Sequence, residues 1–555
     1  MDSRLGKPLA GVAAVLSLAL AACSTPQAAP PAAPAGPDTA AAAQPKVNRL
    51  VLVVPIPQRT ELQIRHMPEN SSWILRPMHD FPVNVNSATG KLEAGIATEW
   101  AWEPDGKGVR VKLRPNIPFH NDGGVVTSAD IKFAWEQLVQ KDSLHGQAPY
   151  WRDNVTGVDV VSPTEFVYRL KGPDGNFVTA MSEEQGGAEI QSKASFDKNG
   201  PASYATGPYN GSGPFRYIAG AADQYVRFQK APYQHWRANA VFPEFEFRFV
   251  KEASTRMAAL IAGEVQMASL PTDLQNQAEK QGMKTMAGKF PGVRVFGGFY
   301  CCYLNDPSDV SKGYKFPDSP YMDLRVRQAI NKAMNRDEIN KSLYGGKGQL
   351  MYVNHMNQSR QGWNPQWEKD FQSTYGYDPA GAKKLLADAG QSNLKTTVFV
   401  APTTGIAGGE DLAEAAAGYL RAVGIQVDLQ SIDLTEQSNR QRTFAYSNHI
   451  AFASTGSNSW TGWTTRNSSL GTRGGGVEDP DIDRVLRQLV VTTDEKRREE
   501  LWRQVGDTAF AKAISINLFW LPYEISVNPK IVGAWEFPGT LSGGYTHVWN
   551  IKPAS

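Results

Sequence analysis

The feature that most constrains this chain is a strand–helix–strand pattern between residues 396 and 429. A β-branched run over 396–400 comes first, an apolar-periodic helix over 412–423 follows, and residues 425–429 alternate apolar and polar. Two strands joined by a helix pair in parallel, because the helix carries the chain back across one face of the sheet. The sequence therefore predicts an α/β protein.

Two further helices carry clear start and stop signals. Thr127 can cap one of them, with Asp130 three residues on. Asp378 can cap the other, Pro379 occupies its first turn and Gly390 ends it. The second helix buries Ala382, Leu385, Leu386 and Ala389 on one face.

The length of 555 residues exceeds what one hydrophobic core usually supports, so two or more lobes are expected. Apolar residues make up 41% and charged residues 20%, which is typical of a soluble protein. The net charge of +2, with no long run of Lys or Arg, argues against nucleic acid as a partner.

Cysteine and histidine are scarce. Three cysteines are too few for a disulfide framework, and adjacency strains any bond between Cys301 and Cys302, which we expect in a strand, one on each face. No zinc motif occurs, and a copper or nickel site would rely on His355 with Met351 and Met356. We therefore predict no metal and no cofactor.

The amino terminus has the layout of a secretory signal. Arg4 and Lys7 precede an apolar run over 9–22 that is shorter than the roughly 20 residues of a membrane span. Residues 20–23, Leu-Ala-Ala-Cys, resemble the lipobox of bacterial lipoproteins, in which the cysteine receives a diacylglyceryl group. This predicts a signal peptide over 1–22 and a lipid on Cys23, with a simple secretory signal as the alternative.

Residues 23–46 predict a tether. Pro, Ala, Ser, Thr and Gln dominate this segment, which offers nothing to build a core from. Largely extended, it would reach about 70 Å at roughly 3.1 Å per residue. We expect a lipid-anchored protein of the cell envelope, on the periplasmic or extracytoplasmic face.

Several segments, in order, resemble extracellular solute-binding protein family 5, the peptide and nickel type that serves ABC importers. The blocks that carry the resemblance are Leu92–Trp100, Leu113–Gly123, Val126–Ile131, Gly211–Tyr217, Asp323–Ile330 with Met334–Arg336, and Tyr377–Gly390. Any one block is weak, but their order and spacing over most of the body make the resemblance specific.

The resemblance implies a two-lobed periplasmic-binding-protein fold of class II, the large type with an extra inserted subdomain. Its mixed sheets would be flanked by helices. The implied division is lobe I over 47–75, 196–294 and 515–555, the inserted subdomain over 76–195, and lobe II over 295–514.

The implied function is binding without catalysis. The protein would be a monomer that captures an oligopeptide or similar solute between its lobes and delivers it to an ABC permease, while a cytoplasmic ATPase hydrolyses ATP. No Gly-x-Ser-x-Gly elbow or phosphate-binding loop supports the other class, a secreted hydrolase. A ligand-sensing lipoprotein remains open.

Aromatic residues mark the predicted ligand site, since solute clefts combine apolar walls with a few oriented polar groups. In the family, the segment matching residues 452–463 faces the ligand. The candidates are Trp460, Trp463, Tyr300, Tyr303, Asn305, Trp520, Tyr523 and Arg466. Burial of the tryptophans in a lobe core is the competing interpretation.

The ligand itself stays open. Peptide-binding members often carry an aspartate in that loop to pair with the ammonium group, yet residues 454–463 contain no carboxylate. Either a residue outside this loop pairs with the ligand's amine, or the ligand has no amine, as is true of an oligosaccharide. Arg466 and Arg473 can meet a ligand carboxylate, or they are solvated loop charges.

Overall fold

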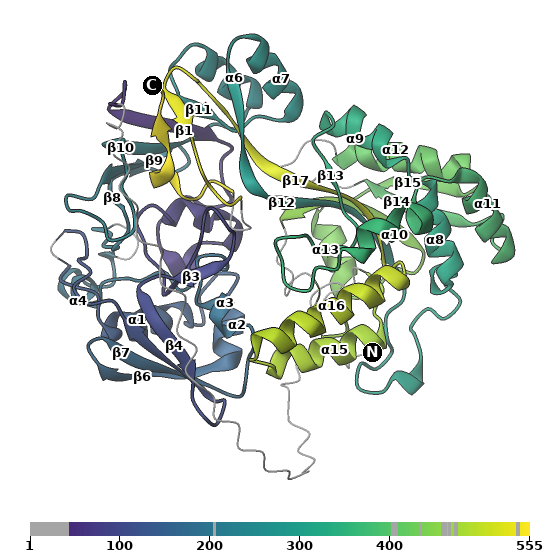
Figure 1. Cartoon of the computed structure of the whole chain (residues 1–555), viewed down its shortest axis with the longest axis horizontal. Coiled ribbons are helices and arrows are strands. Elements are labelled where there is room, and N and C mark those ends of the chain that lie inside the picture. Colours follow the sequence, from purple (N-terminus) through teal and green to yellow (C-terminus); the bar gives the residue numbers. More distant parts are fainter. Residues whose placement is uncertain are drawn as a thin grey trace.

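The computed structural model describes residues 44–121, 123–203, 207–400, 409–432, 434–456, 463, 468–470, 476–539 and 544–555. The chain forms two lobes joined by a pair of long strands, β12 (Lys284–Tyr300) and β17 (Ser515–Val527), which cross from one lobe to the other (Figure 1). These two strands place the lobes relative to each other.

One sheet runs through both lobes in the order β15-β14-β16-β12-β17-β11-β1-β10-β9-β8, with β13 paired to β17. Lobe I is named here for the strands on the β8 side of the crossing pair: β1 (Arg49–Val54), β8 (Phe215–Ala221), β9 (Tyr225–Lys230), β10 (Glu244–Phe249) and β11 (Met267–Ala268). β1 pairs in parallel with β10, while β10 and β9 are antiparallel. The sheet is therefore mixed.

Lobe II is built on the other end of the same sheet. Its strands are β13 (Gln349–Leu350), β14 (Lys395–Val400), β15 (Gln426–Ser431) and β16 (His449–Gly456). Its helices are α8 (Leu324–Ala333), α9 (Arg336–Tyr344), α10 (Gln366–Tyr375), α11 (Pro379–Asp388), α12 (Gly409–Ala422), α13 (Leu434–Arg442), α15 (Pro480–Val491) and α16 (Glu495–Ala511).

The predicted strand–helix–strand unit is confirmed. β14 and β15 pair in parallel, with Val398 opposite Leu429, and α12 connects them. The buried face of α12 joins the core of lobe II through Leu412, Ala416 and Leu420. The helix capped by Asp378 is also confirmed as α11, where the Asp378 carboxylate accepts from the Gly381 N–H at 2.8 Å.

The inserted subdomain is attached to lobe I and has a core of its own. Its antiparallel sheet, in the order β4-β5-β7-β6, consists of β4 (Ala97–Trp102), β5 (Gly108–Leu113), β6 (Val155–Ser162) and β7 (Glu165–Leu170). The remaining elements are β2 (Val83–Val85), β3 (Leu92–Ala94), α1 (Ser128–Leu138), α2 (Ala148–Asn154), α3 (Phe177–Ala180) and α4 (Lys193–Asn199). The predicted start of α1 is confirmed as a capping box of Thr127 and Asp130, in which the Thr127 N–H donates to the Asp130 carboxylate at 2.8 Å.

The crossing strands contribute to two separate hydrophobic cores. Ile525 and Val527 of β17 belong to the core of lobe I, whereas Ile516 and Leu518 of the same strand belong to the core of lobe II. Lobe I is completed by α6 (Ala253–Ile261), α7 (Thr272–Lys280), β18 (Val532–Ala534) and β19 (Lys552–Pro553). Each lobe thus has an interior of its own.

The ladder between β12 and β17 is irregular where it passes between the lobes. Register shifts separate Ala287 from Pro291 and Pro291 from Val293, and a further shift lies between Val295 and Phe296. Gly292 sits in this stretch, and a Cβ there would lie 2.0 Å from the Gly539 carbonyl oxygen. Bulges bend strands, so the connection between the lobes is bent in this stretch.

The adjacent cysteines differ from the prediction. β12 ends at Tyr300, so Cys301 and Cys302 follow the strand instead of lying on its two faces. The chain turns here because the Tyr303 N–H donates to the Cys301 carbonyl at 2.8 Å. The two cysteines are buried, as expected, but they are joined in a disulfide.

Among the residues that the structure describes, no helix is long and apolar enough to cross a membrane. The predicted signal segment, Cys23 and nearly all of the predicted tether lie outside the described residues.

Candidate functional site

The inserted subdomain of lobe I touches lobe II at the ends of α15 and α16 (Figure 1). The Gly175 N–H donates to the Val490 carbonyl at 2.8 Å, and the Arg498 guanidinium donates to the Asn176 side-chain oxygen at 3.0 Å. A Cβ on Gly175 would lie 2.1 Å from the Thr492 carbonyl oxygen, so only glycine allows this approach. The two lobes are in contact here.

Two opposite charges, one from each lobe, influence each other. Glu184 lies between α3 and α4 of the inserted subdomain, and Arg360 lies between β13 and α10 of lobe II. Burial raises the pKa of the Glu184 carboxyl, and the positive charge of Arg360 opposes that rise. Burial likewise lowers the pKa of the Arg360 guanidinium, opposed by the charge of Glu184. The two half-buried groups attract each other across the lobe interface.

Arg360 lies beside one of the predicted aromatic residues. Its guanidinium carbon is 5.8 Å from the ring centroid of Trp520, within the range of a cation–π contact. Trp520 is 2% exposed, and its indole N–H donates to the Met356 carbonyl at 3.1 Å. The Trp520 ring therefore lies beneath the Arg360 guanidinium, and the Trp520 indole N–H is already bonded within the protein.

Trp463 is fully buried within lobe II. Its ring centroid lies 5.8 Å from that of His355, and it belongs to the core cluster of the lobe. Met351 and Met356, which the sequence groups with His355, are buried among apolar and aromatic side chains. In the described parts of the chain, no group of three or more His, Cys, Asp or Glu side chains could hold a metal ion.

Tyr300, Tyr303 and Asn305 lie away from Trp520. Arg294 stands opposite Trp520 in the β12–β17 ladder, and Tyr300 comes six residues later on the strand, about 20 Å away at roughly 3.3 Å per residue. Tyr300 and Tyr303 are buried, and Asn305 is exposed and donates to the Lys312 carbonyl at 2.9 Å. The structure does not bring these three residues together with the tryptophan.

Tyr523 lies at the irregular stretch between the lobes. Its ring is so close to Gly292 that a Cβ on the glycine would come within 2.6 Å of it. Burial raises the pKa of the Tyr523 phenol above its ordinary value, which keeps the side chain neutral. Trp460, Arg466 and Arg473 lie outside the described residues.

Sequence reasoning missed Glu184, Arg360, Asn176 and Arg498. None belongs to a motif, and single charged residues in loops are common on solvated surfaces. The only available signal was the paired Glu183-Glu184 in a glycine-containing stretch, which by itself indicates a solvated turn.

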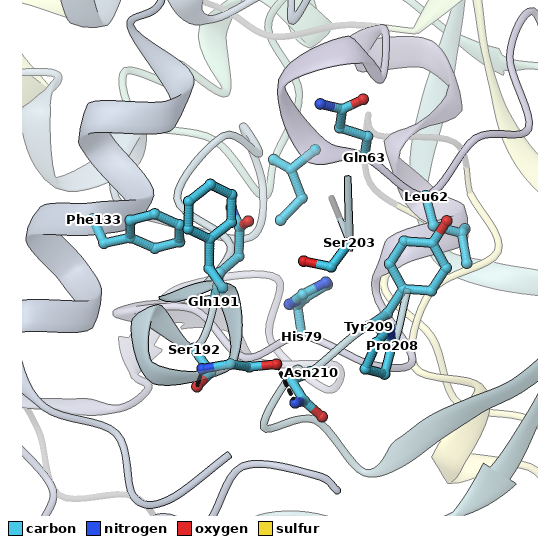
Figure 2. A pocket seen from close by; sticks show the side chains of 13 residues that line it. Leu62, Gln63, His79, Phe133, Gln191, Ser192, Ser203, Pro208, Tyr209 and Asn210 are labelled. Carbon is cyan, nitrogen blue, oxygen red and sulfur yellow. Dashed lines mark hydrogen bonds between the residues drawn. The ribbon is translucent and has the colours of Figure 1, made fainter. Parts of the chain in front are cut away.

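A small cavity lies elsewhere, between the body of lobe I and the inserted subdomain (Figure 2). His79, Ser203 and Asn210 line it together with Leu62 and Phe133. Its volume is about 40 Å³, whereas sites for small-molecule ligands are about 300 Å³ or larger. A cavity of this size and polarity accommodates water, not a transported solute.

Two lobes on a shared sheet, joined by a bent strand pair, define the class of bilobal binding proteins. Residues 91–476 match the family model of bacterial extracellular solute-binding proteins, family 5. The chain belongs to this family, as predicted. The family consists of solute-binding proteins for transport and not of enzymes.

Over the aligned regions, curated relatives are about a quarter identical to this chain. The oligopeptide-binding protein AppA of Bacillus subtilis is 24% identical over 59% of this chain and 60% of its own length. A di/tripeptide-binding protein of Pseudomonas aeruginosa is 25% identical over 75% of this chain and 78% of its own. The chain thus matches about three fifths of the length of the Bacillus relative.

Solved structures confirm the predicted fold. HbpA2 from Haemophilus parasuis superimposes with a TM-score of 0.72 at 19% identity, covering 91% of this chain and 100% of that protein. The unliganded open form of the murein tripeptide-binding protein MppA gives 0.72 at 18% identity, covering 92% and 98%. At these identities the likeness establishes the two-lobed fold and nothing finer.

Proposed function

We propose that this protein is the lipid-anchored substrate-binding component of an ABC importer. It captures an oligopeptide or similar small solute between its lobes and delivers it to a membrane permease, while a separate cytoplasmic ATPase supplies the energy. The proposal depends on one combined observation. The chain belongs to this family, and the β12–β17 ladder that connects its two lobes is irregular between them.

The mechanism is closure about the connecting strands. Each lobe keeps its own core, so the lobes move as bodies, and the stretch between Ala287 and Val293 absorbs the rotation. A ligand that touches both lobes lowers the free energy of the closed arrangement only. It therefore shifts the population toward that arrangement. The permease then recognises the closed form.

The names of the relatives favour a peptide as the solute, since they describe oligopeptide and di/tripeptide binding. An oligosaccharide is the second candidate, because residues 454–463 place two tryptophans among Ser, Thr and Asn with no carboxylate. The lipid on Cys23, the tether over 23–46 and the domain boundaries at 76, 195, 295 and 514 remain part of the proposal.

Mass spectrometry of the small molecules that co-purify with the protein tests the function directly. We expect a bound solute that is released on unfolding and recovered unchanged. A melting-temperature screen complements it, since a solute at 100 times its dissociation constant adds about 2.7 kcal/mol of stability. Conversion of the solute into a product by the pure protein would contradict a transport role.

A further inference from the structure

The loop between α9 and β13 of lobe II, residues 345–348, lies against lobe I (Figure 1). The Lys347 ammonium donates to the Gln275 side-chain oxygen of α7 at 2.8 Å and to the Glu524 carboxylate of β17 at 3.0 Å. The lobes therefore touch beside the connecting strands as well as at Gly175.

The lysine spans the irregular part of the β12–β17 ladder. Glu524 pairs with Ala287 before the register shifts, whereas Trp520 pairs with Arg294 after two of them. β13 follows the loop directly and pairs with β17 at Trp520. Rotation of one lobe about the irregular stretch therefore changes the distance between the Lys347 ammonium and the Glu524 carboxylate.

Both sides of this contact are held within their own lobes. In lobe II, the Asn340 side chain accepts from the Gly348 N–H at 2.8 Å and donates to the Gly348 carbonyl at 2.9 Å. In lobe I, the Gln275 side-chain nitrogen donates to the Leu270 carbonyl at 3.0 Å, which leaves its oxygen for the lysine. Relative movement of the lobes must therefore be accommodated by the Lys347 side chain.

The charges of this contact are partly shielded from water. The side chains of Lys347 and Glu524 are 28% and 16% exposed. Salt screens such a pair less than an exposed pair, and separating it leaves a half-buried carboxylate without its counter-charge. The contact thus stabilises the arrangement in which it forms, and in that arrangement the Gly175 N–H also reaches the Val490 carbonyl across the lobes.

We propose that the loop over residues 345–348 is a clasp that holds the lobes closed, with Lys347 as the bonding residue. Part of the free energy of closure then comes from the protein itself. The closed arrangement is populated before a solute binds, and a solute that touches both lobes adds to that preference. The clasp acts in the same way whatever solute the protein takes.

Hydrogen exchange at single-residue resolution tests the clasp. The full-length protein is freed of any co-purified solute by refolding from guanidinium chloride. Exchange at the Gly175 N–H reports how often the lobes separate, because this N–H is bonded across them. The Leu170 N–H, bonded at 2.8 Å to the Lys107 carbonyl inside the inserted subdomain, is the reference. Lys347→Met should accelerate exchange at Gly175 about threefold to tenfold and leave Leu170 unchanged.

Two further variants show whether the charge pair itself is responsible. Glu524→Gln should also accelerate exchange at Gly175. Its combination with Lys347→Met should exceed the stronger single variant little, because both remove the same contact. Lys341→Met removes an exposed positive charge from α9 and is the matched control with unchanged exchange.

Unchanged or slower exchange at Gly175 in the variants would overturn the clasp. Equal acceleration at Gly175 and Leu170 would also overturn it, since the lysine would then stabilise the fold as a whole. Glu524→Gln preserves the shape of the side chain and decides the question if Lys347→Met fails to fold. Since no solute is added, none of these outcomes depends on the proposed transport function.

Discussion

The interiors of the two lobes use charge in different ways. Where the inserted subdomain joins lobe I, carboxylates meet histidine and arginine: Asp80 lies 3.2 Å from His235 and 3.1 Å from Arg237. In lobe II, buried arginines instead donate to backbone carbonyls, as Arg336 does to Asn517 at 2.7 Å and to Tyr375 at 2.9 Å.

Buried histidines are more numerous in lobe I, although lobe II also contains His355 and His449. Five of the eight histidines lie buried in lobe I and its inserted subdomain: His79, His120, His145, His235 and His547. An arginine bound to carbonyls keeps its charge over the whole physiological range, and even burial lowers the pKa of Arg336 only to about 9. We therefore expect lobe I to be the lobe that acid disrupts first.

The largest expected effect comes from removing the carboxylate of Asp80. Burial works to raise its pKa, but the charges and hydrogen bonds of His235 and Arg237 outweigh burial and hold the pKa well below its ordinary value. Asp80→Ala leaves the buried His235 and the half-buried Arg237 without their shared carboxylate, which costs about 3 to 5 kcal/mol. Urea unfolding measures the loss, with the exposed Asp105→Ala as the control; a change below about 1 kcal/mol would contradict the argument.

Acid should destabilise lobe I by a similar amount. Burial, opposed by a hydrogen bond to the Gly213 carbonyl, lowers the pKa of His120 to about 4, and burial also lowers the pKa of His79 and His145. The folded state favours neutral imidazole, so this stability is present above pH 6.5 and is lost as the pH falls.

For His120 alone, the expected loss between pH 7 and pH 4 is about 3 kcal/mol. Glu183 adds a loss of the same sign, because His547 and Arg237 overcome the effect of burial and bring its pKa to about 2. Hydrogen exchange resolved by peptide, at pH 7 and at pH 4.5, measures the two lobes separately. Earlier opening of lobe II than of lobe I on acidification would refute the comparison.

The contact between the lobes can be broken with a single methyl group. Gly175→Ala places a Cβ 1.8 Å from the Arg498 guanidinium and 2.1 Å from the Thr492 carbonyl, so the closed arrangement should lose about 1 kcal/mol, or about fivefold in population. Gly172→Ala, where a Cβ meets nothing within 4 Å, is the matched control. Small-angle scattering should show a wider particle for the first variant only, and identical curves would exclude a role of this contact in closure.

Helix caps should give the smallest effects and should not distinguish the lobes. Thr127→Ala removes the side chain that meets the N3 backbone N–H in the capping box of α1, and Asp378→Ala removes the carboxylate that accepts from the Gly381 N–H at the start of α11 in lobe II. Each should cost about 1 kcal/mol, because one backbone donor at the helix start loses its partner. Thermal unfolding of both variants checks this, and a severalfold difference between them would show that local capping depends on the lobe.

Much of the fold could be predicted because its signals are local. Thr127 and Asp378 stand where the helices begin, and the strand–helix–strand unit over 396–429 forms with the parallel register that its pattern demands. The prediction that the adjacent cysteines lie in a strand was wrong, because the residue at which a strand ends depends on the strands it pairs with. Pairing of β12 with β17 stops at Gly298, and the chain turns at Cys301.

The candidate site was less predictable. Aromatic content selected Trp520 as a ligand residue, which stays a prediction, and it grouped Tyr300 with Trp520, although the two lie far apart along the sheet. Glu184 and Arg360 are 176 positions apart by their numbering and belong to no motif. Their meeting depends on how the two lobes come together.

The sequence by itself determined the class of elements, their caps, the family and the prediction of an anchor at the amino terminus, because each depends on residues close together in the chain. Only the tertiary structure decided which charges face one another across the lobes, and that histidines gather where the inserted subdomain joins lobe I. Such placements arise from packing between distant segments, where burial and the nearness of opposite charges, and not local periodicity, set the energy of each side chain.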